Sequence, residues 1–323
     1  MAENDKSTCC VKGWGAGRDT AVAPAGWADL PRADPAEQQA LRDALVPIPG
    51  GIFEMGTRHS TYPEDLDSPR RKVRVSPFRI GATTVTNAQF ARFIEATGYR
   101  TVAEKEGWSF VFHLLLDRPE DWPLSPGRLT WWRRVDGACW AAPEGPGSEW
   151  QDRPDHPVVQ VCWYDAMAYC QWSCLRLPRE AEWERAARGG HARRKFPWGN
   201  ALTPEGRHMM NVWQGDFPNV NTAEDGHVGT APARSYEPND YGLYAMTGNV
   251  WEWVGDRYGP RPAPGRMPEV DPEGPDEGAS RMQRGGSFLC HASYCDRYHV
   301  HSRTANDPDS ATSNAGFRVA ASA

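Results

Sequence analysis

The chain has 323 residues, of which 39% are hydrophobic and 24% charged, a balance typical of a globular protein with a sizeable core. Its formal net charge is −6, and its one basic block, SPRRKVRV, is short, which argues against nucleic-acid binding. No apolar run approaches the ~20 residues of a membrane span. With 31 glycines, 28 prolines and 15 tryptophans, the sequence indicates an irregular but packed fold.

The character of the sequence changes at about residue 45. Residues 1–44 mix Ala, Pro, Gly and Asp without periodicity, and they predict an irregular tail with one short helix over 36–45. A single domain is expected over 45–321. Within it, residues 46–56 predict two short strands joined by a Gly-Gly turn, and the alternation over 72–81 predicts a further strand.

A first long helix is predicted over residues 86–98. Thr86 or Asn87 would cap it, and Gly98 would end it. The stretch 105–155 is aromatic and broken by prolines, so we expect a long irregular insertion there.

Two more helices follow the insertion. One covers 163–173, with Asp165 near its start, and the other covers 177–190, with Pro178 in its first turn. Beyond it only turns and short strands are expected. The whole pattern predicts an α+β domain with little regular secondary structure.

Eight cysteines are too few for a disulfide-stapled chain of this length, and no apolar leader stands at the N-terminus, so we expect reduced thiols and a cytoplasmic protein. Cys290 and Cys295 lie in RGGSFLCHASYCDRYHVHSR, residues 284–303. Two thiolates suit Cu(I), and nearby histidines could complete a zinc site. A disulfide or two plain core cysteines fit the same spacing, so all four interpretations stay open here.

Two further segments are candidates for ion binding. Residues 211–232, NVWQGDFPNVNTAEDGHVGTAP, carry many oxygen-bearing side chains among glycines, a composition that suits Ca²⁺. A polar surface loop with Asx turns explains that composition as well. Farther on, Glu252 lies between Trp251 and Trp253. A carboxylate between two large aromatic residues is either paired with a cation or directed toward solvent.

Several short motifs connect these segments to a known family. The chain contains GNVWEW, RLP-x-EAEWE, FPWGN and NAGFRVA, together with GGSFLCHASYCDRY and NDPDSATSN. In these motifs it resembles the formylglycine-generating enzyme (sulfatase-modifying factor) family from about residue 46 to 319. GNVWEW and GFR recur across the wider superfamily. The cysteine pair is more specific, because it separates true formylglycine generators from their non-catalytic relatives.

The resemblance implies a fold, an activity and a partner. The fold would be a variant of the C-type lectin-like fold. The activity would be oxidation of a cysteine, within a Cys-x-Pro-x-Arg motif of a sulfatase, to Cα-formylglycine with O2 and an external reductant. The expected partner is an unfolded sulfatase polypeptide, and binding to nucleic acid or to membranes is not expected. The enzyme is expected to be a monomer. For the arginine of the client motif, Asp155 is our candidate acidic partner.

The resemblance also implies the active-site residues. Cys290 and Cys295 would bind Cu(I), with the client thiolate as a third ligand. Ser287 matches a family serine close to the cysteines, and Trp251 matches an aromatic wall of the site. Asn314 matches a residue near the substrate groove.

Two structural calcium sites of the family map onto the chain as well. In the first, Asn211 and Asp225 would supply side-chain oxygens, and Val212 and His227 would supply carbonyls. In the second, the carboxylate of Glu252 would be joined by the carbonyls of Gly248 and Val250. Ala245 stands where many members have an asparagine, so this second site lacks one oxygen and its occupancy is doubtful.

Other positions depart from the family pattern. Secreted animal members have a disulfide at the positions of Cys170 and Val319, and this bond cannot form here. Cys174 and Leu175 replace a usual Gly-Lys, so a left-handed backbone at this Gly position would strain Cys174. His301 replaces a small residue near the site.

Two other functions compete with the enzyme. A non-catalytic lectin-like binding module would not need the cysteine pair. An iron-dependent sulfoxide synthase on the same fold would need an His-x3-His-x-Glu run, which the sequence lacks.

Overall fold

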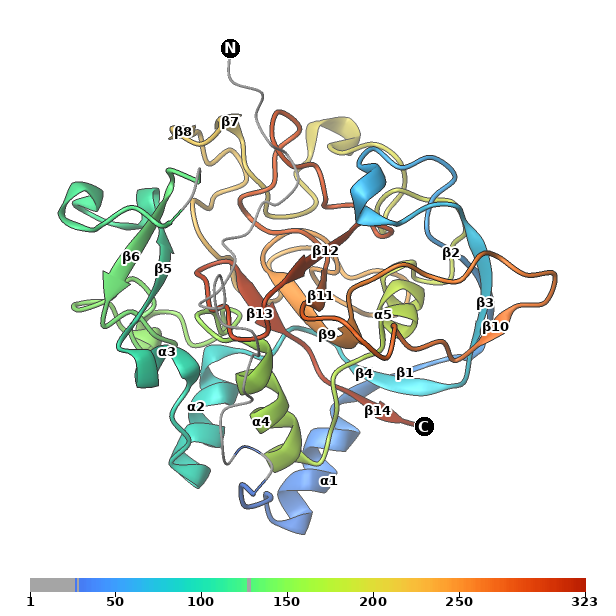
Figure 1. Ribbon diagram of the computed structural model, residues 1–323, viewed down its shortest axis with the longest axis horizontal. Helices are drawn as coiled ribbons and strands as arrows, with labels where there is room; N and C mark the ends of the chain where they lie inside the picture. The colour runs from blue at the N-terminus through green and yellow to red at the C-terminus, as the bar shows by residue number, and fades with distance from the viewer. Residues whose placement is uncertain (1–26, 28, 127–128) are drawn as a thin grey trace.

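The structure is a computed structural model that describes residues 27, 29–126 and 129–323. Short helices and strands alternate with long loops (Figure 1). The α-helices of the described residues are α1 (Pro35–Asp43), α2 (Asn87–Thr97), α3 (Val102–Glu106), α4 (Trp163–Ser173) and α5 (Glu180–Ala187). Single 3₁₀ turns cover Pro63–Asp65, His113–Leu115, Pro119–Asp121, Trp150–Asp152 and Pro204–Gly206.

The strands form several small sheets rather than one large one. They are β1 (Leu45–Ile48), β2 (Gly51–Met55), β3 (Arg71–Val75), β4 (Phe78–Gly81), β5 (Trp108–Phe112), β6 (Trp132–Asp136), β7 (Gly215–Asp216), β8 (Val220–Asn221), β9 (Trp251–Arg257), β10 (Glu269–Val270), β11 (Arg281–Arg284), β12 (Arg303–Asn306), β13 (Ala315–Phe317) and β14 (Ala320–Ser322). With the helices, they confirm the predicted α+β class and its modest regular structure.

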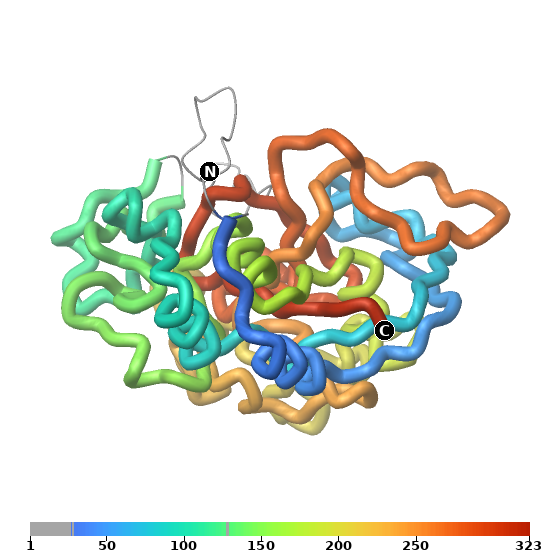
Figure 2. Tube along the Cα trace, turned by 90° about the horizontal axis from the view of Figure 1, so that it is seen from below, coloured from blue at the N-terminus to red at the C-terminus, as the bar shows by residue number. Residues whose placement is uncertain are grey.

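A four-stranded sheet in the order β12-β11-β9-β13 lies at the centre. β11 is antiparallel to both of its neighbours, and β13 runs parallel to β9 with Ala315 beside Trp251. Figure 1 shows the β5–β6 hairpin at one end of the molecule and the β10-β3-β2 sheet at the other. Figure 2 shows α1 and the C-terminal strand close together on one side. Two of the motifs reach into the central sheet, since GNVWEW ends in β9 and NAGFRVA contains β13.

The long helices form where the sequence predicts them. α2 is capped by Thr86 through a capping box with Gln89, and Gly98 ends it with φ of 64°. α4 begins where the Asp165 carboxylate accepts the Cys162 amide at 2.9 Å. α5 begins at Glu180, so Pro178 precedes the helix instead of lying in its first turn. Arg179 remains extended at the cap position.

Two expectations need correction. The stretch 72–81 is not one strand, because Ser76 and Pro77 break it into β3 and β4, which join different sheets; proline has no N–H for a ladder. The two short strands predicted over 46–56 are present as β1 and β2, and β1 pairs with β4 while β2 pairs with β3. The stretch 105–155 is not wholly irregular, since it contains the regular β5–β6 hairpin.

The largest part of the core joins α2 and α4 to the central sheet. Phe93 of α2 lies edge-on to Tyr169 of α4, with ring centroids 5.6 Å apart, and Phe317 of β13 lies 5.5 Å from the same tyrosine ring. Such buried ring pairs contribute about 1 kcal/mol each beyond their buried area. No helix of the described residues combines the length and apolar character that crossing a membrane requires.

Candidate active site

Cys290 and Cys295 lie in the loop between β11 and β12. A tight turn forms there because the Cys295 amide donates to the His291 carbonyl at 2.7 Å. Both cysteines are 1% exposed, and their Sγ atoms are 3.8 Å apart, well beyond a disulfide bond of about 2.05 Å. The turn therefore presents two buried sulfur atoms side by side without cross-linking them.

Three other predicted site residues converge on this pair. The Asn314 side-chain amide donates to the Ser287 hydroxyl at 3.0 Å, and the Ser287 amide donates to the Cys290 sulfur at 3.4 Å. The Trp251 amide donates to the Asn314 carbonyl at 2.8 Å, and Trp251 belongs to the same apolar cluster as both cysteines. β9 and β13 thus bring the distant predicted residues together with the cysteine loop.

Arg297 is a neighbour of the cysteines that the sequence analysis missed. Its Nη1 lies 3.7 Å from the Cys295 Sγ, and its guanidinium lies 3.9 Å from the Tyr62 ring centroid. Asp65 holds it with two hydrogen bonds of 2.6 and 2.9 Å. Burial raises the pKa of Asp65, and the guanidinium opposes that shift. The partners lie more than 200 residues apart in the chain, and no local pattern links them.

Tyr294, between the two cysteines, begins an aromatic wall that sequence reasoning also missed. Trp131 meets it edge-on and Phe217 stacks on it, each with ring centroids 4.9 Å apart. Trp131 comes from the turn before β6, so the supposed insertion supplies part of the wall beside the cysteines. The clustering of tryptophans in this stretch was the available signal.

The residues of the first predicted calcium site lie close together in the structure. Asp225 Oδ1 accepts the His227 amide at 3.0 Å, and its Oδ2 accepts the Val212 amide at 3.3 Å. The Asn211 Nδ2 donates to a carbonyl at 2.8 Å, while its Oδ1 is buried without a hydrogen-bond partner. Burial raises the pKa of Tyr236, and the neighbouring Asp225 carboxylate raises it further. An orphaned amide oxygen beside a carboxylate fits a hard cation.

This loop is hydrogen-bonded to the loop that carries the cysteines. The Trp213 amide donates to the Cys290 carbonyl at 3.2 Å, only two residues after Asn211. The backbone at the first cysteine is therefore held in part by residues 211–232.

The second predicted calcium site has a different character. The Glu252 carboxylate, 1% exposed, accepts two hydrogen bonds of 2.6 Å from Arg318 and one of 2.7 Å from the Trp183 indole. A guanidinium thus already provides the positive charge. Ala245 has a left-handed backbone with φ of 46° and adds no oxygen. These residues do not fit a calcium ion in this arrangement, so only the first site is considered further.

The remaining predicted positions are held by partners other than the two cysteines. Asp155 is exposed, and its carbonyl accepts the Ala233 amide at 2.9 Å. His301 is held by Asp67 at 2.9 Å. Cys174 ends α4 with φ of 54° and ψ of 29°, so the expected left-handed strain at this position is present.

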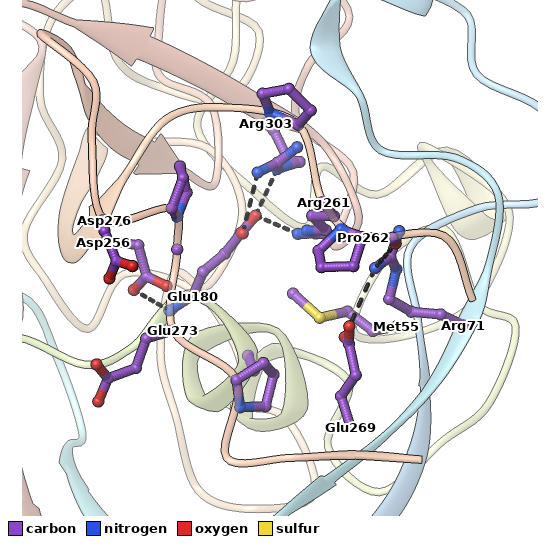
Figure 3. A pocket seen from close by; sticks show the side chains of 15 residues that line it. Met55, Arg71, Glu180, Asp256, Arg261, Pro262, Glu269, Glu273, Asp276 and Arg303 are labelled. Carbon is purple, nitrogen blue, oxygen red and sulfur yellow. Dashed lines mark hydrogen bonds and ion pairs between the residues drawn. The ribbon is translucent and has the colours of Figure 1, made fainter. Parts of the chain in front are cut away.

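The charged cavity in Figure 3 contains none of the predicted site residues. It has a volume of about 340 Å³ and lies at the start of α5. Glu180 is contacted there by Arg261, Arg284 and Arg303 at 2.5 to 2.8 Å. Burial and the neighbouring Glu180 raise the pKa of Asp256 to about 7. The walls are thus largely ion-paired with one another.

The side chains around Cys290 and Cys295 suit a two-coordinate soft ion better than zinc. In the described part of the chain, no group of three or more His, Cys, Asp or Glu side chains is arranged to hold a metal ion. A zinc site with four such ligands is therefore not formed around Cys290 and Cys295. Two adjacent thiols still fit a soft ion that accepts two protein ligands.

The chain is similar in sequence to known proteins. The family described as sulfatase-modifying factor enzyme 1-like domain matches residues 31–323. A formylglycine-generating enzyme of Thermomonospora curvata is 52% identical over 305 residues, which cover 91% of this chain and 97% of that protein. A Bos taurus protein named inactive C-alpha-formylglycine-generating enzyme 2 is 43% identical over 284 residues, which cover 86% of this chain and 88% of that protein.

A solved structure supports the fold. PvdO from Pseudomonas aeruginosa superposes with a TM-score of 0.63 at 24% identity, covering 86% of this chain and 94% of that one. At this identity the likeness concerns architecture alone. The extent of the family match and the identity to its members show that the chain belongs to the sulfatase-modifying factor enzyme 1-like family.

Proposed function

We propose that this protein is a copper-dependent oxidase that converts the cysteine of a Cys-x-Pro-x-Arg motif in sulfatases to Cα-formylglycine. The observation that carries the proposal is the buried Cys290–Cys295 pair, 3.8 Å apart, in a chain 52% identical to a formylglycine-generating enzyme. In the overall reaction the client thiol, O2, two electrons and two protons give an aldehyde, hydrogen sulfide and water. The external reductant supplies the two electrons.

Cys290 and Cys295 would hold Cu(I), and the bound ion would supply one-electron chemistry with O2, which side chains cannot provide. Their burial excludes water from the sulfur atoms. Arg297 lies next to Cys295, and Asp65 holds it in that position.

Ser287 and Trp251 offer the hydrogen-bond donors of the pocket. Ser287 Oγ accepts from Asn314 and from the Leu289 amide, which leaves its own O–H as a donor. The Trp251 indole N–H is buried without an acceptor. We assign these two donors to the negative charge that develops as O2 is reduced.

The ion of the first calcium site would have a structural role. Asn211 and Asp225 would hold it, together with the carbonyls of Val212 and His227. Its charge would order the loop whose Trp213 amide supports Cys290.

The test uses a synthetic Cys-x-Pro-x-Arg peptide with Cu(I)-loaded protein, a thiol reductant and air. We expect the peptide to lose the mass difference between a thiol and an aldehyde, with O2 consumed and no product under argon. Formation of product without O2, or after removal of copper, would contradict the proposal.

A second peptide tests the client arginine. Replacing it by Ala should raise KM more than it lowers kcat, because the contact is remote from the sulfur chemistry. If Asp155 is its partner, Asp155→Ala raises KM for the Arg peptide and leaves KM for the Ala peptide unchanged.

The inactive Bos taurus relative makes a non-catalytic binding role the second candidate. That role predicts sulfatase-peptide binding without O2 consumption, and the same assay separates the two.

A further inference from the structure

Three sulfur-bearing side chains lie at one end of α4. Met167 and Cys170 are three residues apart on α4, and residues so spaced on a helix are surface neighbours. Cys174 is the C-cap residue that follows the helix, four residues after Cys170. All three line one cavity of about 310 Å³. Cys170 belongs to the α2–α4 core, whereas Cys290 and Cys295 lie in a different cluster. This is therefore a second group of soft donors, distinct from the cysteine pocket.

The burial of these donors is graded. Cys174 is exposed, Met167 is half-buried, and Cys170 is 3% exposed. Cys170 and Cys174 are free thiols. An ion could therefore be captured by Cys174 at the surface and held by Cys170 inside.

The charge around the cavity suits an anionic complex. Two thiolates around a monovalent ion carry one net negative charge. Arg32 and Arg176 line the same cavity, and Arg176 counteracts the burial that raises the pKa of Cys170. Arg176 is also paired with Glu182 at 2.6 Å, so Arg32 provides the charge that is not already committed to that pair.

The backbone of Cys174 supplies an independent indication. It is left-handed, a conformation that glycine adopts at lower cost at the end of a helix. The capping bond runs from the Cys174 amide to the Cys170 carbonyl, and glycine would make the same bond. The local fold therefore gives no reason for a thiol at this position.

We propose that Met167, Cys170 and Cys174 form a second site for a soft monovalent ion of the Cu(I) class. Two thiolates and a thioether are the donors such an ion prefers, whereas zinc would require a fourth ligand. Binding releases two protons from the thiols and transfers no electron. The site does not depend on the proposed oxidase function.

The test is an anaerobic titration of Cu(I) against bicinchoninate, a coloured Cu(I) chelator. The full-length chain carries Cys9→Ser and Cys10→Ser, so that the two N-terminal thiols do not contribute. We expect this protein to withhold two equivalents of Cu(I) from the chelator. Cys174→Gly should withhold one, with an equal or higher melting temperature, because glycine relieves the backbone strain.

Further variants separate the two sites. Cys290→Ser/Cys295→Ser should also withhold one equivalent, and the combination with Cys174→Gly should withhold none. Met167→Leu should keep the stoichiometry and weaken the second site about 10-fold. Cys139→Ser removes a thiol outside both groups and serves as the matched control.

The outcomes are distinguishable. If Cys174→Gly binds as much Cu(I) as the reference protein, the second site is refuted. If instead Cys290→Ser/Cys295→Ser keeps full binding while Cys174→Gly loses one equivalent, the second site stands and the copper assignment of the proposed function fails. Release of two protons per ion in the Cys290→Ser/Cys295→Ser protein would support a bis-thiolate at α4.

Discussion

The cysteine pair and the charged cavity of Figure 3 both contain buried polar groups, and these groups differ in their charge and partners. In the cavity, the Glu180 carboxylate meets three guanidinium groups. In the cysteine pocket, the Trp251 indole N–H is buried without an acceptor, and the adjoining loop buries the Asn211 Oδ1 in the same state. A network in which charges neutralise one another specifies structure. Orphaned polar atoms alone do not separate the two regions, because the Arg71 Nε on the wall of the charged cavity is also buried without a hydrogen-bond partner.

The largest effect is expected in the cysteine pocket. Cys290→Ser or Cys295→Ser should lower kcat/KM by at least about 1,000-fold, because a hydroxyl is a poor ligand for a soft ion. The melting temperature should change little, since the replacement is nearly isosteric. Peptide turnover and thermal unfolding measure the two quantities.

Cys139→Ser should keep wild-type turnover, because this cysteine lies outside the pocket. Wild-type turnover in either pocket variant would end the bis-thiolate assignment.

The opposite pattern is expected in the charged cavity. Glu180→Gln leaves Arg261, Arg284 and Arg303 with less compensating charge, and removal of one partner of a buried ion pair costs about 3–5 kcal/mol. Urea unfolding should show this loss, while turnover per folded molecule stays the same.

Glu273→Gln is the matched control, because Glu273 lies on the rim of the same cavity and is 69% exposed. A surface pair of this kind contributes about 0–1 kcal/mol. An equal loss in both variants would mean that burial does not set the strength of this network.

The proposed calcium site predicts an effect on both stability and activity. With Ca²⁺ at 100 times its dissociation constant, binding to the native state stabilises it by about 2.7 kcal/mol. Asp225→Ala should remove that calcium-dependent increase in stability and lower turnover, because Trp213 of this loop supports Cys290.

Glu224→Ala alters a neighbouring carboxylate that is 63% exposed, and it should respond to calcium like the wild type. If Asp225→Ala kept the full calcium response, the first site would not be a calcium site.

The sequence predicted the parts of this molecule that depend on local patterns. Thr86 and Gly98 predicted the two ends of α2. The left-handed backbone at Cys174 was predicted because cysteine replaces a glycine that is usual at this position of the family motif. Motif resemblance placed Ser287, Trp251 and Asn314 near the cysteines, and the geometry brings them together.

The remainder depends on contacts between distant segments. Arg297 and Asp65 meet across more than 200 residues, and neither position stands out in the sequence. The resemblance predicted Glu252 to be an ion ligand. Nothing in the segment around Glu252 identifies Arg318, 66 residues later in the chain, as its partner. Pro77 was visible, but its division of one strand between two sheets depends on tertiary pairing.

The smallest predicted effect concerns pH and the charged cavity. The pKa of Asp256 is raised to about 7 because the group is buried beside Glu180, against about 3.9 in an unfolded chain. Between these values the folded state keeps a proton that the unfolded state has lost. This group therefore makes the free energy of unfolding fall as pH rises from about 4 to 7.

Asp256→Asn should remove this part of the pH dependence. The amide carries no titrating proton, and its oxygen can still accept the Glu180 amide, which Asp256 does at 2.7 Å. Between pH 5.5 and 7, the variant should lose ~2 kcal/mol less stability than the wild type. Asp276→Asn, an exposed position on the same cavity, should leave the profile unchanged. Because Asp256 does not contact the cysteines, turnover per folded molecule should also be unchanged, and a parallel loss of activity would show that the two regions are coupled.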